Sequence, residues 1–169
     1  MTKTQPKIER TSDGLLIVRL HQVSVNWDQT WEEAIRAGAP NTPKNYAIWQ
    51  AGEQYPAPAG KTGIELIGMS LLGFDRNWQS WEGIDLAADK KARTAHPKQL
   101  FAIGQEYPNL NRILDKEFFA VVCLQKCSIG SLTCLPDLWF EDNKRLAGTF
   151  RADWEWASNF FVAVLGEVS

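Results

Sequence analysis

The chain has 169 residues, of which 44% are hydrophobic and 22% are charged, and its formal net charge is -2. This composition is typical of a globular protein with a substantial core, and a net charge near zero gives no basic face for nucleic acid or an anionic membrane. The longest apolar runs, such as Phe118 to Leu124, are far shorter than the roughly 20 residues that cross a membrane. The N-terminus also lacks the apolar stretch of a secretion signal. The sequence therefore predicts one cytoplasmic domain over residues 1–169 that binds neither nucleic acid nor membranes.

The first predicted elements are a strand and a short helix. The apolar, β-branched residues 15–25 predict the strand. Thr30 and Glu33 match a capping box, in which each side chain accepts a hydrogen bond from the backbone N–H of the other residue. A helix is therefore expected over residues 31–37, with Gly38 closing it in a left-handed conformation.

The polar residues 1–13 are expected to be frayed, as chain ends often are. Residues 39–63 are rich in proline and glycine, and we predict a long loop here, with a short strand at residues 46–49. A loop of this length inside a compact domain is often functional or mobile. The apolar residues 64–73 then predict a second, buried strand.

The middle of the chain has helical patterns. Residues 75–95 are expected to form two helical pieces, because Gly83 weakens the centre and Asp85 suits the N-cap of the second piece. Pro97 suits the first position of a further helix, where its missing N–H costs nothing. The apolar residues 101–104 within that helix would also fit a strand.

The C-terminal segment, about residues 117–166, reads as four strands in a row. A three-residue turn would set Glu141 opposite Arg145, and a second turn would set Trp156 opposite Phe160. In this register, the even-numbered residues of the third strand form one apolar face.

We therefore predict an α+β fold. A single domain is expected, in which an antiparallel C-terminal β-meander (about 117–166) packs against helices from the middle of the chain. The strands at residues 15–25 and 64–73 are expected to extend this sheet. A C-type-lectin-like arrangement, with helices before a late set of strands, is the alternative by analogy alone.

A helix-ending pattern, L-x-A-φ-G-x-x-Y-P-x-L, precedes apolar strands and a Trp-rich C-terminus in this chain. The positions that carry it are Leu100, Ala102, Gly104, Tyr107, Pro108 and Leu110, then Phe119 to Val122, Trp139, Phe140, Trp156, Phe160, Phe161, Ala163 and Val164. Over roughly residues 76–165, this combination resembles an uncharacterised group of short hypothetical bacterial proteins. Members of that group end in a basic tail, whereas this chain ends Leu-Gly-Glu-Val-Ser. The group has no known function, so the resemblance implies a family and no chemistry.

The three cysteines are Cys123, Cys127 and Cys134, and an odd number without a secretion signal indicates reduced thiols. Together with His21 or His96 they raise the question of a zinc site. However, two cysteines four residues apart on a straight strand lie roughly 13 Å from each other. We predict buried structural thiols, no metal and no cofactor, with Cys127 and Cys134 able to face each other across a hairpin.

The eight tryptophans are the unusual feature of the composition. Large aromatic residues fill cores efficiently, but some of them can also form a surface for a ligand or a partner. Since no catalytic constellation is apparent, we predict a non-enzymatic, soluble binding or protein-interaction module that uses exposed aromatic residues and the 39–63 loop to hold an unidentified protein or small ligand. The residues expected to bind are Trp139, Arg151, Asp153, Glu155, Trp49 and Tyr55.

The alternative function is a small cytoplasmic enzyme that combines loop carboxylates with His21 or His96. The sequence contains neither G-x-S-x-G nor H-E-x-x-H, and the stretch from Gly60 to Thr62 lacks the first glycine of a phosphate-binding loop. A purely structural or accessory role is a third possibility. A small basic cluster is interpreted as a solvated helix face; its members are Lys90, Lys91, Arg93 and Lys98.

Overall fold

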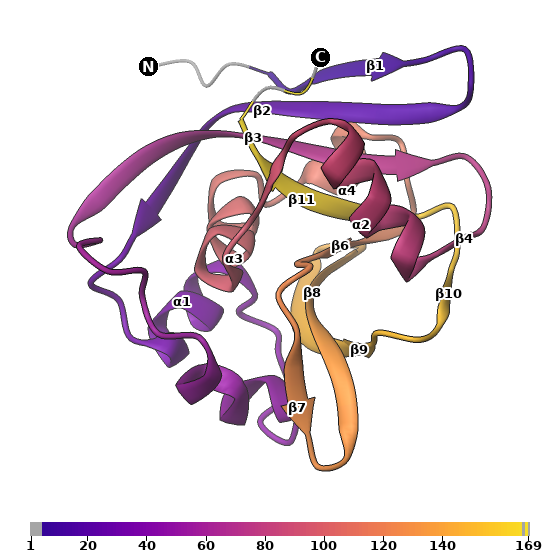
Figure 1. Ribbon diagram of the computed structural model, residues 1–169. Helices are drawn as coiled ribbons and strands as arrows, with labels where there is room; N and C mark the ends of the chain where they lie inside the picture. Colours follow the sequence, from indigo (N-terminus) through magenta and orange to yellow (C-terminus); the bar gives the residue numbers. More distant parts are fainter. Residues whose placement is uncertain (1–4, 167, 169) are drawn as a thin grey trace.

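The computed structural model of the protein describes residues 5–166 and 168. Within this part of the chain, nine strands form one large sheet and two short strands pair separately, with helices packed around them (Figure 1). The strands are β1 (Lys7–Arg10), β2 (Leu15–Asn26), β3 (Ile64–Phe74), β4 (Trp78–Gln79), β5 (Arg93–Thr94), β6 (Phe118–Val122), β7 (Cys127–Ile129), β8 (Leu132–Glu141), β9 (Lys144–Arg151), β10 (Glu155–Trp156) and β11 (Phe160–Leu165). The helices are α1 (Trp31–Gly38), the 3-10 helix η1 (Ala47–Gln54), α2 (Ser80–Asp89), α3 (Pro97–Glu106) and α4 (Leu110–Ile113).

The C-terminal strand β11 lies in the middle of the large sheet. It pairs antiparallel with β3 and parallel with β6, and the sheet continues outward to β2 and β1 on one side and to β8 on the other. Strand β9 pairs with β8, so β9 and β11 are not neighbours. The α+β class is therefore confirmed, since helices pack beside a mixed, mostly antiparallel sheet. The predicted C-terminal meander is wrong. Trp156 lies opposite Trp78 in the small β10–β4 sheet, not opposite Phe160.

The turn between β8 and β9 is one residue shorter than predicted. Asp142 adopts a left-handed conformation with a φ of 49°, which aspartate tolerates and which two-residue hairpin turns require. Glu141 therefore lies opposite Lys144, and Arg145 lies opposite Phe140. Because a shift of one residue exchanges the two faces of a strand, the odd-numbered residues of β9 share a face with Phe140, and the even-numbered residues lie on the other side.

The sheet carries an apolar layer on each face. On one face, Ile35 of α1 and Phe101 of α3 pack with Phe119 of the sheet. On the other face, Ala87 of α2 packs with Trp156 and the neighbouring apolar residues of β6 and β11. Figure 1 shows α2 on the opposite side of the sheet from α1 and α3. Helices thus cover both faces of the sheet.

A bulge in β2 keeps its apolar residues on one face. Leu20 lies opposite Met69 and Val23 lies opposite Ile67, so β2 has one extra residue between these pairs. The residues that enter the first apolar layer change there from even to odd numbers, namely Leu16, Val18 and Leu20, then Val23 and Val25. The strand predicted over residues 15–25 is confirmed.

The capping box of α1 is confirmed. Thr30 accepts a hydrogen bond from the Glu33 N–H at 3.2 Å, and Glu33 accepts one from the Thr30 N–H at 2.7 Å. Gly38, however, does not close the helix in a left-handed conformation, since the cap is Ala39 with a φ of -135°. A Cβ atom at Gly38 would lie 2.1 Å from the carbonyl oxygen of Phe101. The glycine therefore allows the backbones of α1 and α3 to touch.

The structure also corrects three further predictions of secondary structure. Residues 46–49 enter η1 rather than a strand. Of residues 75–95, only α2 is helical, and Gly83 lies inside this helix rather than between two helices. A side chain at position 83 would meet Val162 and the Trp78 ring, which explains the glycine. The end that was expected to be frayed contributes β1, while residues 1–4 lie outside the described part. The helix that begins at Pro97 is confirmed as α3, so the strand alternative for residues 101–104 is wrong.

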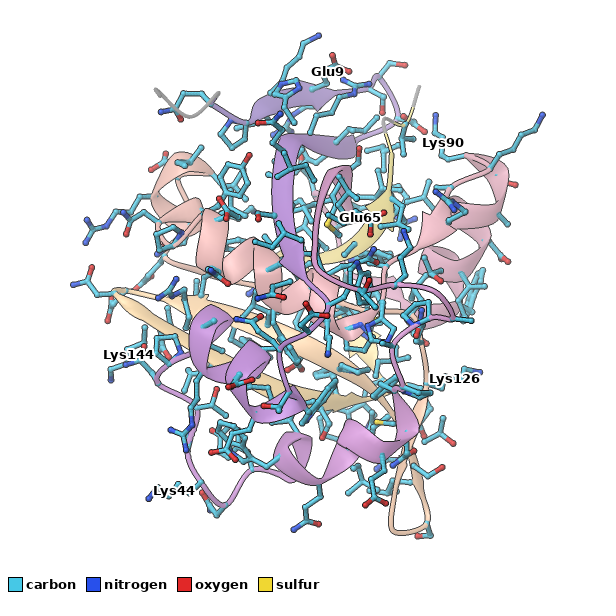
Figure 2. All side chains as sticks on the ribbon, turned by 90° about the vertical axis from the view of Figure 1, so that its left-hand side faces the viewer. Glu9, Lys44, Glu65, Lys90, Lys126 and Lys144 are labelled. Atoms are coloured by element: carbon cyan, nitrogen blue, oxygen red, sulfur yellow. The ribbon has the colours of Figure 1, made fainter. Side chains whose placement is uncertain are left out.

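No helix in the described part of the chain is long and apolar enough to cross a membrane. Figure 2 shows the lysines Lys44, Lys90, Lys126 and Lys144 on different sides of the molecule.

Candidate functional site

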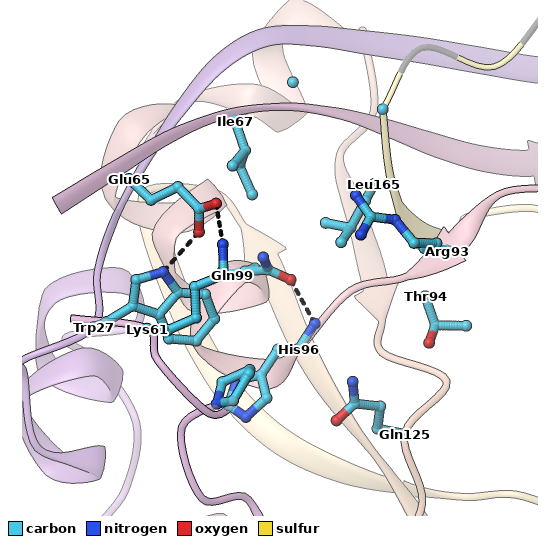
Figure 3. A pocket seen from close by; sticks show the side chains of 13 residues that line it. Trp27, Lys61, Glu65, Ile67, Arg93, Thr94, His96, Gln99, Gln125 and Leu165 are labelled. Atoms are coloured by element: carbon cyan, nitrogen blue, oxygen red, sulfur yellow. Dashed lines mark hydrogen bonds and ion pairs between the residues drawn. The ribbon is translucent and has the colours of Figure 1, made fainter. Parts of the chain in front are cut away.

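A pocket of about 390 Å³ opens between β3, β5, the start of α3 and the Pro-rich segment that follows η1 (Figure 3). Segments far apart in the sequence build it, because β3 and β5 pair with opposite edges of β11 and flank the end of that strand at Leu165. Its apolar wall consists of Trp27, Pro58, Ile67 and Leu165. Its polar wall consists of Lys61, Glu65, Arg93, Thr94, Gln99 and Gln125. The mixture of apolar and polar groups is typical of small-molecule sites.

His96 forms the floor at the N-terminus of α3. Its Nδ1 accepts a hydrogen bond from the Lys98 N–H at 3.1 Å, so the proton of the neutral ring is on Nε2. Nε2–H donates to the Pro56 carbonyl oxygen, which lies 3.2 Å away. Burial lowers the pKa of the ring, which keeps it neutral. Only 6% of His96 is exposed. Both ring nitrogens are engaged with backbone, so His96 fixes the Pro-rich segment against α3.

Glu65 is held by two donors. It accepts a hydrogen bond from the Trp27 Nε1–H at 2.8 Å and forms an ion pair with Lys61 (Figure 3). The hydrogen bonds from Lys61 and then Trp27 lower the pKa of Glu65, so it is ionised at neutral pH. The buried Lys98 supports this arrangement, because its ammonium donates to the Trp27 carbonyl oxygen at 3.1 Å. Glu65 and Lys61 therefore neutralise each other at the rim.

Arg93 brings an unbalanced charge to the pocket. It lies on β5 opposite Leu165, and Figure 3 shows its guanidinium beside the Leu165 side chain. Among the described residues, no carboxylate forms an ion pair with it; its charge acts on Glu65 only as the weakest influence on that pKa. The amide of Gln125 and the hydroxyl of Thr94 also face the pocket. Arg93 and these neutral polar groups can together bind an anion.

Of the residues predicted to bind, Tyr55 lies behind the pocket against His96, with ring centroids 6.2 Å apart, and Trp49 does not line the pocket. Tyr55 is 5% exposed, stacks on Trp31 with ring centroids 5.5 Å apart, and donates its hydroxyl to the Gln125 carbonyl oxygen at 2.8 Å. Burial is the main reason that the pKa of Tyr55 is raised. Trp49 is half-buried and donates to the Pro43 carbonyl oxygen at 2.7 Å. Tyr55 therefore ties the 39–63 segment to the body of the protein, whereas the Trp49 hydrogen bond stays within that segment.

The other four predicted residues do not form one row. Arg151 and Asp153 form an ion pair at 2.8 Å, but β9 ends at Arg151, so Glu155 belongs to β10. Trp139 lies on the opposite face of the sheet from Arg151, because the register is shifted by one residue. Trp139 instead packs on Phe118, with ring centroids 6.2 Å apart.

The tryptophans divide between core and surface. Trp27, Trp78 and Trp156 are buried, whereas Trp81 and Trp154 are 59% and 50% exposed. Trp31, Trp49 and Trp139 are half-buried. Exposed aromatic residues therefore exist, but Trp81 and Trp154 do not line the pocket.

The cysteines and His21 do not reach the pocket. All three thiols are free and buried, as predicted, and Cys127 lies directly opposite Cys134. Burial raises the pKa of each thiol, and that of Cys123 is about 12. Within the described residues, no group of three or more His, Cys, Asp or Glu side chains has the geometry of a metal site. His21 lies at the bulge of β2.

The sequence did not single out Arg93, Gln99 or Gln125. Arg93 and Lys98 were assigned to a solvated helix face. Arg93 is indeed exposed but lies on a two-residue strand, whereas only 9% of Lys98 is exposed. The only local indication was the Pro-rich segment, which contributes Pro58 and Lys61 to the wall. Pairing of β5 with β11 is long-range and leaves no local pattern.

Comparisons with known proteins add no identity to this site. No family model matches the sequence, and no curated protein or solved structure matches the chain. The resemblance to short hypothetical bacterial proteins therefore stays a prediction. The residues that carry it have packing roles: Leu100 and Leu110 are fully buried, and the Tyr107 hydroxyl donates to the Gln22 carbonyl oxygen at 3.2 Å.

Proposed function

We propose that the protein is a non-enzymatic binding module that holds a small organic anion in the pocket beside Arg93. The single observation that supports this most strongly is the guanidinium of Arg93, which faces the pocket next to the apolar side chain of Leu165. Since Lys61 and Glu65 neutralise each other, the remaining charge of the pocket is positive. A carboxylate with an apolar body fits these walls, because its charged end can pair with Arg93 while its body packs on Ile67 and Leu165.

The alternative of an enzyme has some support from the same pocket. Two titratable groups with shifted pKa values, His96 and Glu65, line it, and such groups are common in active sites. Each is nevertheless occupied by hydrogen bonds that hold the fold together. A general base must be within reach of a substrate proton, and both nitrogens of His96 already contact backbone. The pocket thus favours binding over chemistry.

Benzoate is a suitable probe for this proposal. We expect it to bind with a Kd that is roughly millimolar, in keeping with its size. Replacement of Arg93 with alanine should weaken binding by about tenfold or more, because a charge-assisted pair is lost. NMR titration of the full chain with benzoate would measure this.

The matched control is Arg112→Ala, which removes an exposed arginine of α4 outside the pocket. The affinity of the Arg112→Ala variant for benzoate should equal that of the unchanged protein. Benzyl alcohol has the same ring without the charge and should bind at least tenfold more weakly than benzoate. Equal affinities of the Arg93→Ala and Arg112→Ala variants would refute the proposal.

A further inference from the structure

A second cavity, of about 440 Å³, lies on another part of the molecule between β8, β9 and the segment before η1. Asp137 of β8 lies in its wall with only 1% of its surface exposed. Asp137 is opposite Gly148 of β9, and a Cβ atom at Gly148 would lie 2.5 Å from the Asp137 Oδ1. The absence of a side chain at Gly148 therefore makes room for the carboxyl group.

The Asp137 carboxyl group accepts hydrogen bonds from the Trp139 side chain and the Gly148 backbone N–H, but one of its oxygens is left without a donor. Its Oδ1 is buried and has no hydrogen-bond partner among the described residues. No lysine, arginine or histidine lines this cavity, so no cation of the protein balances the charge there. A buried carboxyl oxygen without a donor is costly, and a group of this kind in a native fold calls for an explanation.

The remaining walls suit a cation. Tyr46, Trp139 and Phe150 line the cavity beside Asp137, and Tyr46 is 42% exposed at its rim. Trp139 is held in place by Phe118 and Phe160, and its ring centroid lies 5.3 Å from that of Phe160. Aromatic faces attract ammonium groups through the negative charge of the ring face, and the attraction increases away from water.

We propose that this cavity binds a protonated primary amine, whose N–H groups donate to Asp137 while its body packs on Tyr46, Trp139 and Phe150. The ammonium supplies a donor for the unpartnered Oδ1 and a charge that balances the ionised carboxylate. The site is independent of the anion pocket, since the two cavities share no lining residue and Asp137 belongs to the opposite half of the sheet.

Benzylammonium tests this site, and benzyl alcohol is its neutral control. In ¹H–¹⁵N NMR titrations of the full chain at pH 8, benzylammonium should shift the amide signals of residues 45–47, 137–139 and 148–150. Benzyl alcohol should bind at least tenfold more weakly. Asp137→Asn should weaken benzylammonium binding at least tenfold, whereas Asp153→Asn, which alters an exposed acid outside the cavity, should have no effect.

A second variant keeps the test valid if Asp137→Asn alters the fold. Tyr46→Leu changes an exposed side chain at the rim and removes an aromatic face, and it should weaken benzylammonium binding by about threefold. The proposal is overturned if benzyl alcohol binds as tightly as benzylammonium, or if the shifted signals lie outside the three segments. Unchanged affinity in Asp137→Asn would overturn it as well.

Discussion

Replacing Gly104 with alanine should lower the free energy of unfolding by roughly 3–5 kcal/mol, in the range of severe overpacking. A Cβ atom at Gly104 would lie 2.2 Å from the carbonyl oxygen of Gly38, and that oxygen belongs to backbone that cannot rotate away. Helices α1 and α3 would have to separate, and the contacts of Ile35 and Phe101 in the core would weaken. Urea denaturation followed by circular dichroism would measure the change.

Gly68→Ala is the matched control for this experiment. Its Cβ atom would meet only the His21 carbonyl oxygen at 3.8 Å, an ordinary contact distance, so the free energy of unfolding should change by less than about 1 kcal/mol. If Gly104→Ala were as stable as Gly68→Ala, the close crossing of α1 and α3 would be wrong. The start of α3 carries His96 and Gln99, so this crossing also positions the floor of the anion pocket.

Asp137→Asn should remove a pH dependence of stability that the unchanged protein has. Burial raises the pKa of Asp137 to about 7 in the folded state, whereas an unfolded aspartate titrates near 3.9. Between these values the folded state keeps a proton that the unfolded state loses, so stability falls as the pH rises through this window and then becomes constant. From pH 4.5 to pH 8 the loss should be roughly 3 kcal/mol.

The difference in unfolding free energy between Asp137→Asn and the unchanged protein isolates this effect. Other carboxyl groups, such as those of Glu9 and Glu65, have lowered pKa values. These groups are present in both proteins, so their contributions cancel in the difference. The titratable groups near Asp137 are Tyr46, which lines the cavity, and the thiols of Cys127 and Cys134. Denaturation curves at several pH values would test the prediction, and parallel pH profiles for the two proteins would contradict it.

Local features of the fold were predictable from the sequence. The capping box of Thr30 and Glu33 involves residues three positions apart, and the proline at the start of α3 needs no distant partner. Strands β2 and β3 were also predictable from their continuous apolar residues, but β3 is buried only in its second half, since Ile64 and Leu66 are 70% and 62% exposed.

Features that depend on distant partners were not predictable. The insertion of β11 between β3 and β6 joins segments that are far apart in the sequence. The register of β8 and β9 depended on the conformation of the single residue Asp142, and the two-residue turn that it forms exchanges the faces of β9 relative to the predicted three-residue turn.

In the candidate sites, too, local features were predictable from the sequence and features that depend on distant partners were not. The 39–63 segment was recognised from its prolines, and it contributes Pro58 and Lys61 to one cavity and Tyr46 to the other. Arg93 and Asp137 were not recognised as binding residues, because their positions depend on pairing with β11 and β9. A charged residue on a short strand has no sequence pattern that distinguishes a pocket wall from a solvated surface.

The ligand that we propose for the pocket beside Arg93 is a small organic anion. The most direct measurement is a chemical-shift map of the full chain on addition of benzoate, with benzyl alcohol as the uncharged reference. We predict that benzoate shifts the amide signals of residues 93–96, 125 and 165–166, which surround the pocket, and that benzyl alcohol leaves them unchanged at the same concentration. Equal shifts with both compounds, or benzoate shifts confined to other parts of the chain, would contradict the claim.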